Sequence, residues 1–159
     1  MDTITRQTIL LVEDEENDVM FMRMALENAG VAGELQVVED GEQAIDYLDG
    51  RKEFADRQRH PLPALILLDL KFPRVMGMDV LKWIRERPEL DLIVVVVLTS
   101  SQQRSDIHQA CALRANSYLV KPTNPLDLND MMELVKKYWL RLNQPTATIA
   151  AYNASAKRN

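Results

Sequence analysis

The chain has 159 residues, 47% of them hydrophobic and 27% charged, with a formal net charge of −5, which suits one globular domain. No run of apolar residues reaches the roughly 20 that a membrane span needs. Cys111 is the only cysteine, which excludes an intrachain disulfide and a thiolate metal site. The negative charge argues against non-specific nucleic-acid binding, which needs a basic stripe. Residues 1–7 lack the apolar stretch of a signal peptide, so we expect a cytoplasmic protein.

Short apolar runs and helical patterns alternate along the chain. The runs have the length of strands, and the fourth, IVVVVL, is wholly apolar and mostly β-branched, as is typical of a parallel strand covered on both faces. They occupy residues 9–12, 35–38, 65–68, 93–98 and 118–120. After each run, apolar residues recur three and four positions apart, which predicts helices over residues 17–29, 42–48, 78–87, 104–115 and 126–142.

Five strand–helix repeats predict an α/β fold, in which a parallel sheet with right-handed crossovers carries helices on both faces. The positions of Gly30 and Pro88 at the ends of two predicted helices agree with this division. We expect residues 1–142 to form this single domain. Residues 143–159 are too few for a second domain and are interpreted as a C-terminal tail.

Reactive side chains follow four of the five predicted strands. Ligands of an open parallel sheet bind beyond the carboxyl ends of its strands, so these side chains are expected to meet at one rim. Lone acids at strand ends are usually solvated, but the shared edge favours a functional role for those after the first and third strands. The residues are Glu13, Asp14, Glu15, Glu16, Asp69, Thr99, Ser100 and Lys121, of which Glu15 and Glu16 are interpreted as solvated.

The residue types at this rim suit metal-assisted phosphoryl transfer. Carboxylates brought together repel unless a cation joins them, and oxygen ligands with room for water favour Mg²⁺ over zinc. Asp69 can offer one oxygen to the metal and the other to phosphorus, which would form an acyl phosphate. Lys121 and the Thr99 hydroxyl can stabilise the equatorial phosphoryl oxygens.

Four segments, LLVEDEE, LLDLKFPRVMG, VVVVLTSS and SYLVKP, resemble in order the signature segments of the receiver domain of two-component response regulators. The resemblance covers roughly residues 8 to 142 and implies a flavodoxin-like, doubly wound (βα)5 sheet of strand order 2-1-3-4-5. It implies that Asp69 is the phosphoacceptor and that Lys121 assists it. It also implies a switch, in which Thr99 moves toward the phosphoryl group and Tyr118 turns inward.

The same resemblance implies a metal site. Glu13 and Asp14 resemble the acidic pair that holds Mg²⁺ directly and through water, and Asp69 and the backbone carbonyl of Lys71 would complete the shell. Glu13 stands where the family often has Asp, which lengthens the reach to the metal without removing the charge. The Lys121–Pro122 peptide bond would be cis, a geometry that only an X-Pro pair adopts at low cost.

The first helix carries an apolar surface that a core does not need. Met20, Phe21 and Met24 fall nearly opposite the face that should meet the sheet, and exposed methionines around an aromatic ring suggest a partner site. In the family this helix docks on the helical bundle of the kinase. The alternative is that neighbouring loops cover these side chains.

The last helix also has an apolar surplus. Its stripe continues to the end of the helix and is followed by the tail, which predicts a homodimer in which the tail reaches across to the partner. A tail folded on its own subunit is the alternative. The stripe comprises Leu128, Met131, Met132, Val135, Tyr138, Trp139 and Leu142.

We predict a stand-alone response regulator, a signalling protein rather than an enzyme, that accepts a phosphoryl group on Asp69 from a histidine kinase. The long connection 49–63 and the extended last helix resemble the small receivers that serve phytochrome-type kinases. An aspartyl phosphatase would need a second acid where Lys71 stands, and a flavodoxin-like cofactor binder would need a Ser/Thr/Gly-rich loop where the chain has EDEEND. An adaptor-type receiver, which signals by binding without stable phosphorylation, is the alternative that stays open.

Overall fold

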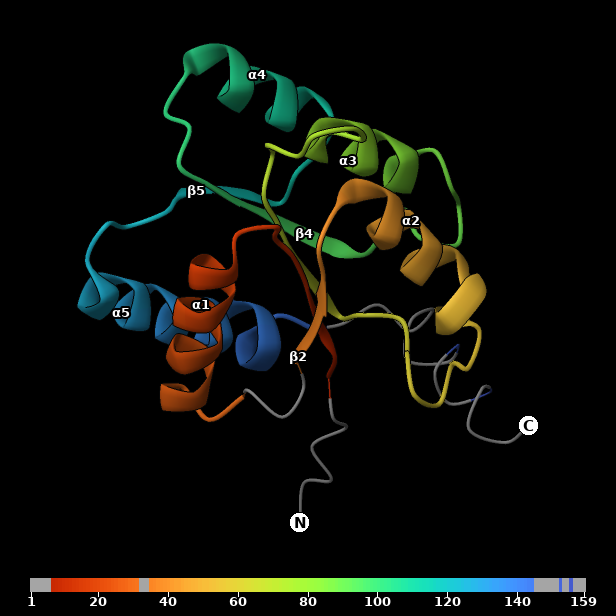
Figure 1. Cartoon of the computed structure of the whole chain (residues 1–159), viewed down its shortest axis with the longest axis horizontal. Coiled ribbons are helices and arrows are strands. Elements are labelled where there is room, and N and C mark those ends of the chain that lie inside the picture. Colours follow the sequence, from red (N-terminus) through yellow and green to blue (C-terminus); the bar gives the residue numbers. More distant parts are fainter. Residues whose placement is uncertain (1–6, 32–34, 145–151, 153–154, 156–159) are drawn as a thin grey trace.

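Five parallel strands form the centre of the structure in the order β2-β1-β3-β4-β5 (Figure 1). The computed structural model describes residues 7–31 and 35–144, together with Tyr152 and Ser155. Strand order and direction confirm the predicted flavodoxin-like sheet. The strands are β1 (Ile9–Val12), β2 (Leu35–Val38), β3 (Leu65–Leu68), β4 (Val94–Thr99) and β5 (Ser117–Val120).

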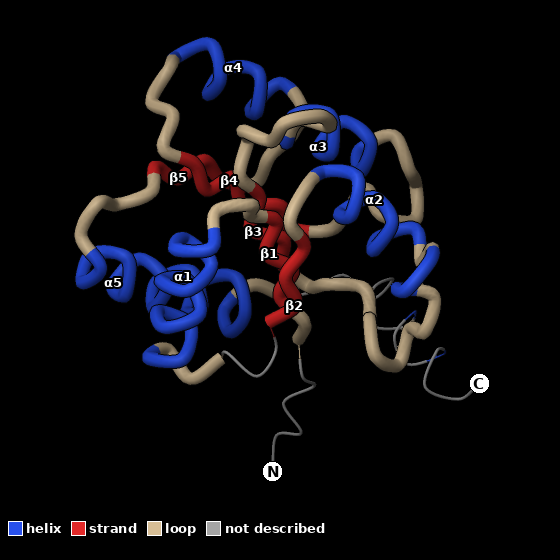
Figure 2. The backbone as a smooth tube through the Cα atoms, viewed as in Figure 1, coloured by secondary structure: helices blue, strands red, loops and turns tan. Residues whose placement is uncertain are grey.

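Helices cover both faces of this sheet (Figure 2). One layer is formed by α1 and α5, and the other by α2, α3 and α4. The predicted helices are present, with ends that differ from the prediction by a few residues except in the last one. Their bounds are α1 (Glu16–Asn28), α2 (Gly41–Asp49), α3 (Gly77–Arg85), α4 (Arg104–Ala112) and α5 (Pro125–Val135), with a 3₁₀ turn η2 (Lys52–Phe54) and a π-helical segment η3 (Lys136–Leu142).

The strand side chains alternate between the two layers, because successive residues of a strand point to opposite faces of the sheet. In β1, Leu10 and Val12 pack with side chains of α2 and α3, whereas Ile9 and Leu11 pack with those of α1 and α5. All four are buried. The wholly apolar composition of the central strands follows from this burial on both faces.

Local sequence signals set several helix ends. The Asp40 carboxylate accepts a hydrogen bond from the first turn of α2, and Gly50 ends that helix in the left-handed conformation that glycine adopts readily. Asn124 caps α5 in the same way, and Pro125 occupies its first position, where the missing N–H costs no hydrogen bond.

The last helix differs from the prediction of one α-helix over residues 126–142. After Val135 the chain continues as η3, and the N–H of Asn143 donates to the carbonyl of Tyr138, five residues back (2.7 Å). The wider turn changes which side chains face the core. Trp139 packs against it, while Tyr138 and Leu142 are 57% and 72% exposed, so the end of the predicted apolar stripe faces outward.

The long connection between α2 and β3 is anchored to the core. Phe54 is buried against the ring of Tyr47, with 5.2 Å between the ring centroids. Arg57 donates hydrogen bonds to the carbonyls of Tyr47 and Leu48 (2.6 and 2.7 Å) in the last turn of α2, where carbonyls lack partners further along the helix. These contacts hold the segment against α2 and the core.

The C-terminal tail falls largely outside the described residues. Of the predicted segment 143–159, only Asn143, Gln144, Tyr152 and Ser155 are described, so the predicted dimerisation arm stays a prediction. The same holds for the predicted boundary between residues 1–142 and 143–159. Within the described part of the chain, no helix has both the length and the apolar character needed to cross a membrane.

Candidate functional site

The strand register brings the predicted reactive residues to one rim of the sheet. Val12 lies beside Leu68, and the pairing continues past the strand ends, where the N–H of Asp69 donates to the carbonyl of Val12 (3.2 Å). Similarly, the N–H of Lys121 donates to the carbonyl of Thr99 (2.8 Å). Glu13, Asp69, Thr99 and Lys121 therefore leave neighbouring strands at the same level.

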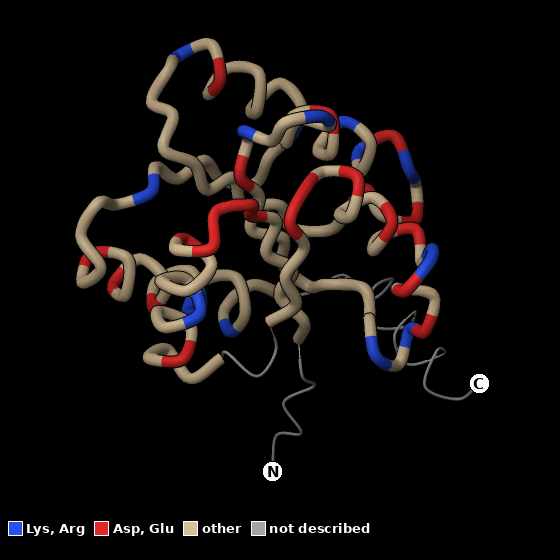
Figure 3. The backbone as a smooth tube through the Cα atoms, in the orientation of Figure 1, with Lys and Arg blue, Asp and Glu red and all other residues tan. Residues whose placement is uncertain are grey.

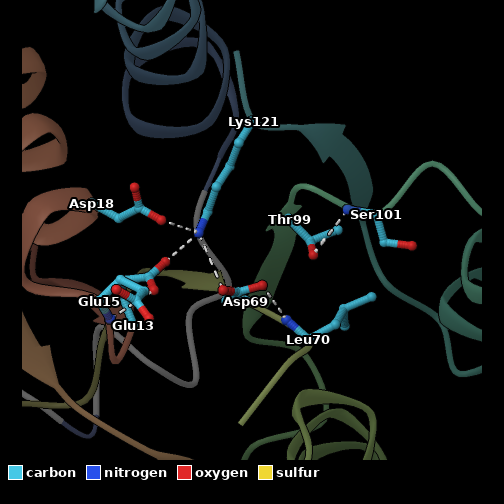
Figure 4. Close-up of polar contacts among 8 residues, drawn as sticks. All are labelled: Glu13, Glu15, Asp18, Asp69, Leu70, Thr99, Ser101 and Lys121. Carbon is cyan, nitrogen blue, oxygen red and sulfur yellow. Dashed lines mark hydrogen bonds and ion pairs between the residues drawn. The ribbon is translucent and has the colours of Figure 1, made fainter. Parts of the chain in front are cut away.

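The Lys121 ammonium group is the centre of this arrangement (Figure 4). Its Nζ donates to the carboxylates of Glu13, Asp18 and Asp69, with 3.1 Å to Asp18 Oδ2 and 3.1 Å to Asp69 Oδ2. Three elements thus meet at one nitrogen: the end of β1, the first turn of α1 and the end of β3. Sequence reasoning did not identify Asp18, because an acid in the first turn of a helix is common without any site nearby.

Burial and charge determine the ionisation of the central pair. Burial raises the pKa of Glu13, and the hydrogen bond and charge of Lys121 offset this only in part. Burial lowers the pKa of Lys121, but the hydrogen bond to Glu13 and the charge of Asp69 outweigh it, so the pKa lies above its ordinary value. Lys121 is therefore charged at neutral pH.

The carboxylates at the rim can share a divalent cation. Glu13, Asp14 and Asp69 can each offer one oxygen, and these three atoms lie within 4.8 Å of one another. One ammonium group faces these acids and Asp18, so negative charge is in excess. Asp14 is exposed, which leaves the site open to ions from solvent. All the donors are hard oxygens, as Mg²⁺ and similar cations require.

Acidic residues also surround this rim. Figure 3 shows the acids that follow β1 as a continuous red stretch beside the ends of the central strands. Glu15 and Glu16 are exposed, in agreement with their interpretation as solvated side chains. Lys71, whose backbone carbonyl is the fourth predicted metal ligand, follows the end of β3 and has an exposed side chain.

Asp69 is held in a fixed position at the end of β3. Its Oδ1 accepts a hydrogen bond from the N–H of Leu70 (2.7 Å), and its Oδ2 accepts one from Lys121. The start of α3 packs directly beneath: a Cβ atom on Gly77 would lie 2.1 Å from the carbonyl oxygen of Asp69. Glycine is therefore required at position 77 for this approach of helix and strand.

Thr99 and Tyr118 are joined through Ser101. Thr99 is fully buried, and its Oγ1 accepts a hydrogen bond from the N–H of Ser101 (3.4 Å). The Tyr118 hydroxyl donates to the carbonyl of Ser101 (2.9 Å), and the Ser101 hydroxyl donates to Asp106 on α4 (2.5 Å). The ring of Tyr118 packs against the buried cluster that includes Val97. Ser101, which sequence reasoning did not identify, thus connects the end of β4 to α4 and β5.

The Lys121–Pro122 peptide bond differs from the prediction. Among the described residues no peptide bond is cis, so the expectation of a cis bond here is wrong. For an X-Pro bond the trans form is favoured by about 0.5–1 kcal/mol, and it prevails unless the surroundings select cis.

The outer face of α1 is exposed as predicted. Met20, Phe21 and Met24 are 49%, 38% and 52% exposed, whereas Met22 on the opposite face is buried. Phe21 also borders a cavity of about 330 Å³ between α1 and the loop after β5, and Lys121 reaches the same cavity. The apolar face of α1 and the reactive rim are therefore neighbours.

Known proteins are similar to this chain in sequence. The sequence model of the response regulator receiver domain matches residues 9–133. The probable methanogenesis regulatory protein FilR2 of Methanothrix harundinacea is 39% identical over 136 residues, which are 86% of this chain and 85% of that protein. Response regulator Rcp1 of Synechocystis is 37% identical over 134 residues, which are 84% of this chain and 89% of that protein.

Solved structures share its fold. The phosphorylated cyanobacterial phytochrome response regulator RcpA superposes with a TM-score of 0.82 at 35% identity, over 89% of this chain and 99% of that chain. The Mn²⁺-bound form of Rcp1 superposes with a TM-score of 0.79 at 35% identity, again over 89% of this chain and 99% of that one. One of these relatives is thus known in a phosphorylated form and the other with a divalent metal ion.

Proposed function

Because the chain belongs to the response regulator receiver family, we propose that it accepts a phosphoryl group on Asp69 from a histidine kinase and signals through the resulting conformational change. The observation that carries this proposal is the position of Asp69. It is a largely buried carboxylate that lies 3.1 Å from the Lys121 ammonium and can share a cation with Glu13 and Asp14.

In the proposed reaction an oxygen of Asp69 attacks the phosphorus atom of a phosphohistidine. The new O–P bond is an acyl phosphate, the P–N bond breaks, and the imidazole keeps the electron pair and takes up a proton. Glu13, Asp14, Asp69 and the Lys71 carbonyl would hold Mg²⁺, which when bound neutralises charge on the equatorial oxygens. The short distance from Lys121 to Asp69 supports a role for its ammonium group in holding a further phosphoryl oxygen.

The signal would be a shift between two arrangements of the β4–α4 region. Phosphorylation adds about −1.5 to −2 charges at Asp69, and a hydroxyl that moves to bind the phosphoryl group favours one arrangement over the other. Thr99 would provide that hydroxyl. The hydrogen bonds of Ser101 to Thr99 and Tyr118 support a coupled movement of these residues, with Tyr118 as the switch.

We expect the protein to be cytoplasmic. We expect its partner to be a histidine kinase of the phytochrome type, because RcpA is described as a phytochrome response regulator and the similarity extends over 89% of this chain. The protein would then be a signalling component whose output is binding. The net charge of −5 is consistent with an output that does not involve nucleic acid.

Incubation of the wild-type chain with acetyl phosphate and Mg²⁺ tests the proposed function without knowledge of the kinase. We expect the intact mass to rise by one phosphoryl group, and we expect no rise when EDTA removes the metal. A chain that never gains a phosphoryl group, but still binds its partners, would instead support the adaptor alternative.

Replacement of Phe21 by Glu tests the docking face of α1. A charge in the middle of an apolar contact should slow phosphotransfer from a histidine kinase about tenfold or more, while phosphorylation by acetyl phosphate is unchanged. Both rates are measured from intact mass. The control is Leu92→Glu, since Leu92 is also an exposed apolar residue (59%, against 38% for Phe21) but precedes β4 at the opposite end of the sheet. Equal slowing with both donors would refute the docking role.

Removal of the tail tests the predicted homodimer. Leu134, Tyr138 and Leu142 are each more than half exposed, which supports an interface along the last helix. We expect light scattering to give a dimer for the full chain and a monomer for a chain that ends at Asn143. An unchanged dimer after truncation would contradict a tail that reaches across to the partner.

A further inference from the structure

Asp18, in the first turn of α1, contacts Lys121 but has no part in the proposed reaction. Asp18 Oδ2 lies 3.1 Å from Lys121 Nζ and approaches it from α1, whereas Asp69 approaches from β3 (Figure 4). We propose that Asp18 is a positioning residue, which holds the Lys121 ammonium where it can bind the phosphoryl group on Asp69. This role rests on the proposed transfer of a phosphoryl group to Asp69.

Asp18 stands apart from the acids that can share a cation. Among the described residues that group consists of Glu13, Asp14 and Asp69. The side chain of Asp18 is also 44% exposed, against 2% for Glu13 and 16% for Lys121. An acid that binds the lysine, but lies outside the group of metal ligands, acts on the reaction through the lysine.

The number of ammonium protons determines what Lys121 can hold at one time. Its three protons are shared here among Glu13, Asp18 and Asp69. Once Asp69 is an acyl phosphate, its negative charge has moved to the phosphoryl oxygens, which then attract the third proton. Glu13 and Asp18 would keep Nζ in place from two directions. Without Asp18, only Glu13 would hold the flexible side chain, which would regain rotamer freedom.

If Asp18 acted only through its charge, its removal would change the phosphorylation rate in the opposite direction from the loss of a positioning residue. A phosphodonor is an anion, so a variant that merely loses a negative charge near the site should bind it better and react at least as fast. A variant that loses a positioning residue should reach a lower limiting rate. Asp18→Asn keeps the size of the side chain, removes its charge and weakens its bond to Lys121. The direction of the rate change therefore distinguishes the two explanations.

The matched control is Glu16→Gln. Glu16 lies in the same first turn, is exposed, and has no described contact with Lys121, so its variant loses the same charge near the same helix end. With acetyl phosphate and saturating Mg²⁺, we expect Asp18→Asn to lower the limiting rate of phosphorylation about fivefold. Its half-saturating donor concentration should stay equal or fall. Glu16→Gln should leave the limiting rate unchanged.

A second measurement needs no reaction. In metal-free protein labelled with ¹⁵N, the Lys121 ammonium should give a resolved NMR signal, because hydrogen bonds slow its proton exchange. Asp18→Asn should broaden or remove this signal, and Glu16→Gln should preserve it.

Two outcomes would overturn the role of Asp18. One is an Asp18→Asn limiting rate equal to or above that of Glu16→Gln, and the other is an unchanged Lys121 signal. A wild-type chain that gains no phosphoryl group would overturn the proposed function as well as the role of Asp18. Failure of the Asp18 role alone would leave the wild-type chain phosphorylated, so the two failures are distinguishable.

Discussion

The Asp69→Asn variant is expected to gain no phosphoryl group under conditions in which the wild-type chain is phosphorylated. The amide has neither the charge nor the nucleophilic oxygen of the carboxylate, so the loss should be at least roughly a thousandfold. The measurement is intact mass after incubation with acetyl phosphate and Mg²⁺. Asp130→Asn, which changes an exposed acid on α5, serves as the control and should react normally.

The fold should survive this change. Asn keeps an oxygen that can accept the hydrogen bond from Leu70, and Lys121 keeps Glu13 and Asp18 as partners. Removal of one carboxylate from an acidic cluster also reduces repulsion, so we expect the thermal midpoint not to fall. Undiminished phosphorylation of a folded Asp69→Asn variant would mean that another residue is the acceptor.

The Lys121→Ala variant is expected to show the second largest effect. Lys121 places a positive charge 3.1 Å from the acceptor carboxylate, and loss of such a preorganised group slows reactions of this kind about a hundredfold or more. The rate is read from the intact mass over time with acetyl phosphate at saturating Mg²⁺. Lys82→Ala, which removes an exposed lysine of α3, is the matched control.

A structural role for Lys121 predicts a different pattern. If it only balanced the acids in the resting protein, its loss would change thermal stability while the phosphorylation rate at saturating Mg²⁺ stayed near that of the wild type. Lys121→Arg adds a further test, because it keeps the charge but replaces a compact ammonium by a planar fork. We expect it to recover only part of the rate, and full recovery would argue against a specific position for the ammonium.

Much of the site could be predicted from the sequence because parallel strands end at one rim. Each apolar run of β1, β3, β4 and β5 is short and must be buried, whereas the polar residues that follow it are excluded from the core, so the end of each strand is fixed. The sequence therefore predicts that Glu13, Asp69 and Lys121 meet, and in the structure the Lys121 ammonium donates hydrogen bonds to both carboxylates.

The features that were missed depend on contacts that no short pattern records. Asp18 contacts Lys121, 103 residues away in the chain, and an acid at that point of a helix has a sufficient local explanation. Ser101 acts through its backbone carbonyl as well as its side chain, and backbone groups carry no sequence signal. The change to a π-helical turn at Lys136 also depends on packing, since the same apolar spacing suits an α-helix.

The most direct test of the central claim is to locate the phosphoryl group on the wild-type chain. Peptide mass spectrometry after reaction with acetyl phosphate and Mg²⁺ should find it on Asp69 alone. A phosphoryl group on any other residue, with Asp69 unmodified, would contradict the claim that the acids, the hydroxyl and Lys121 at this rim serve that carboxylate.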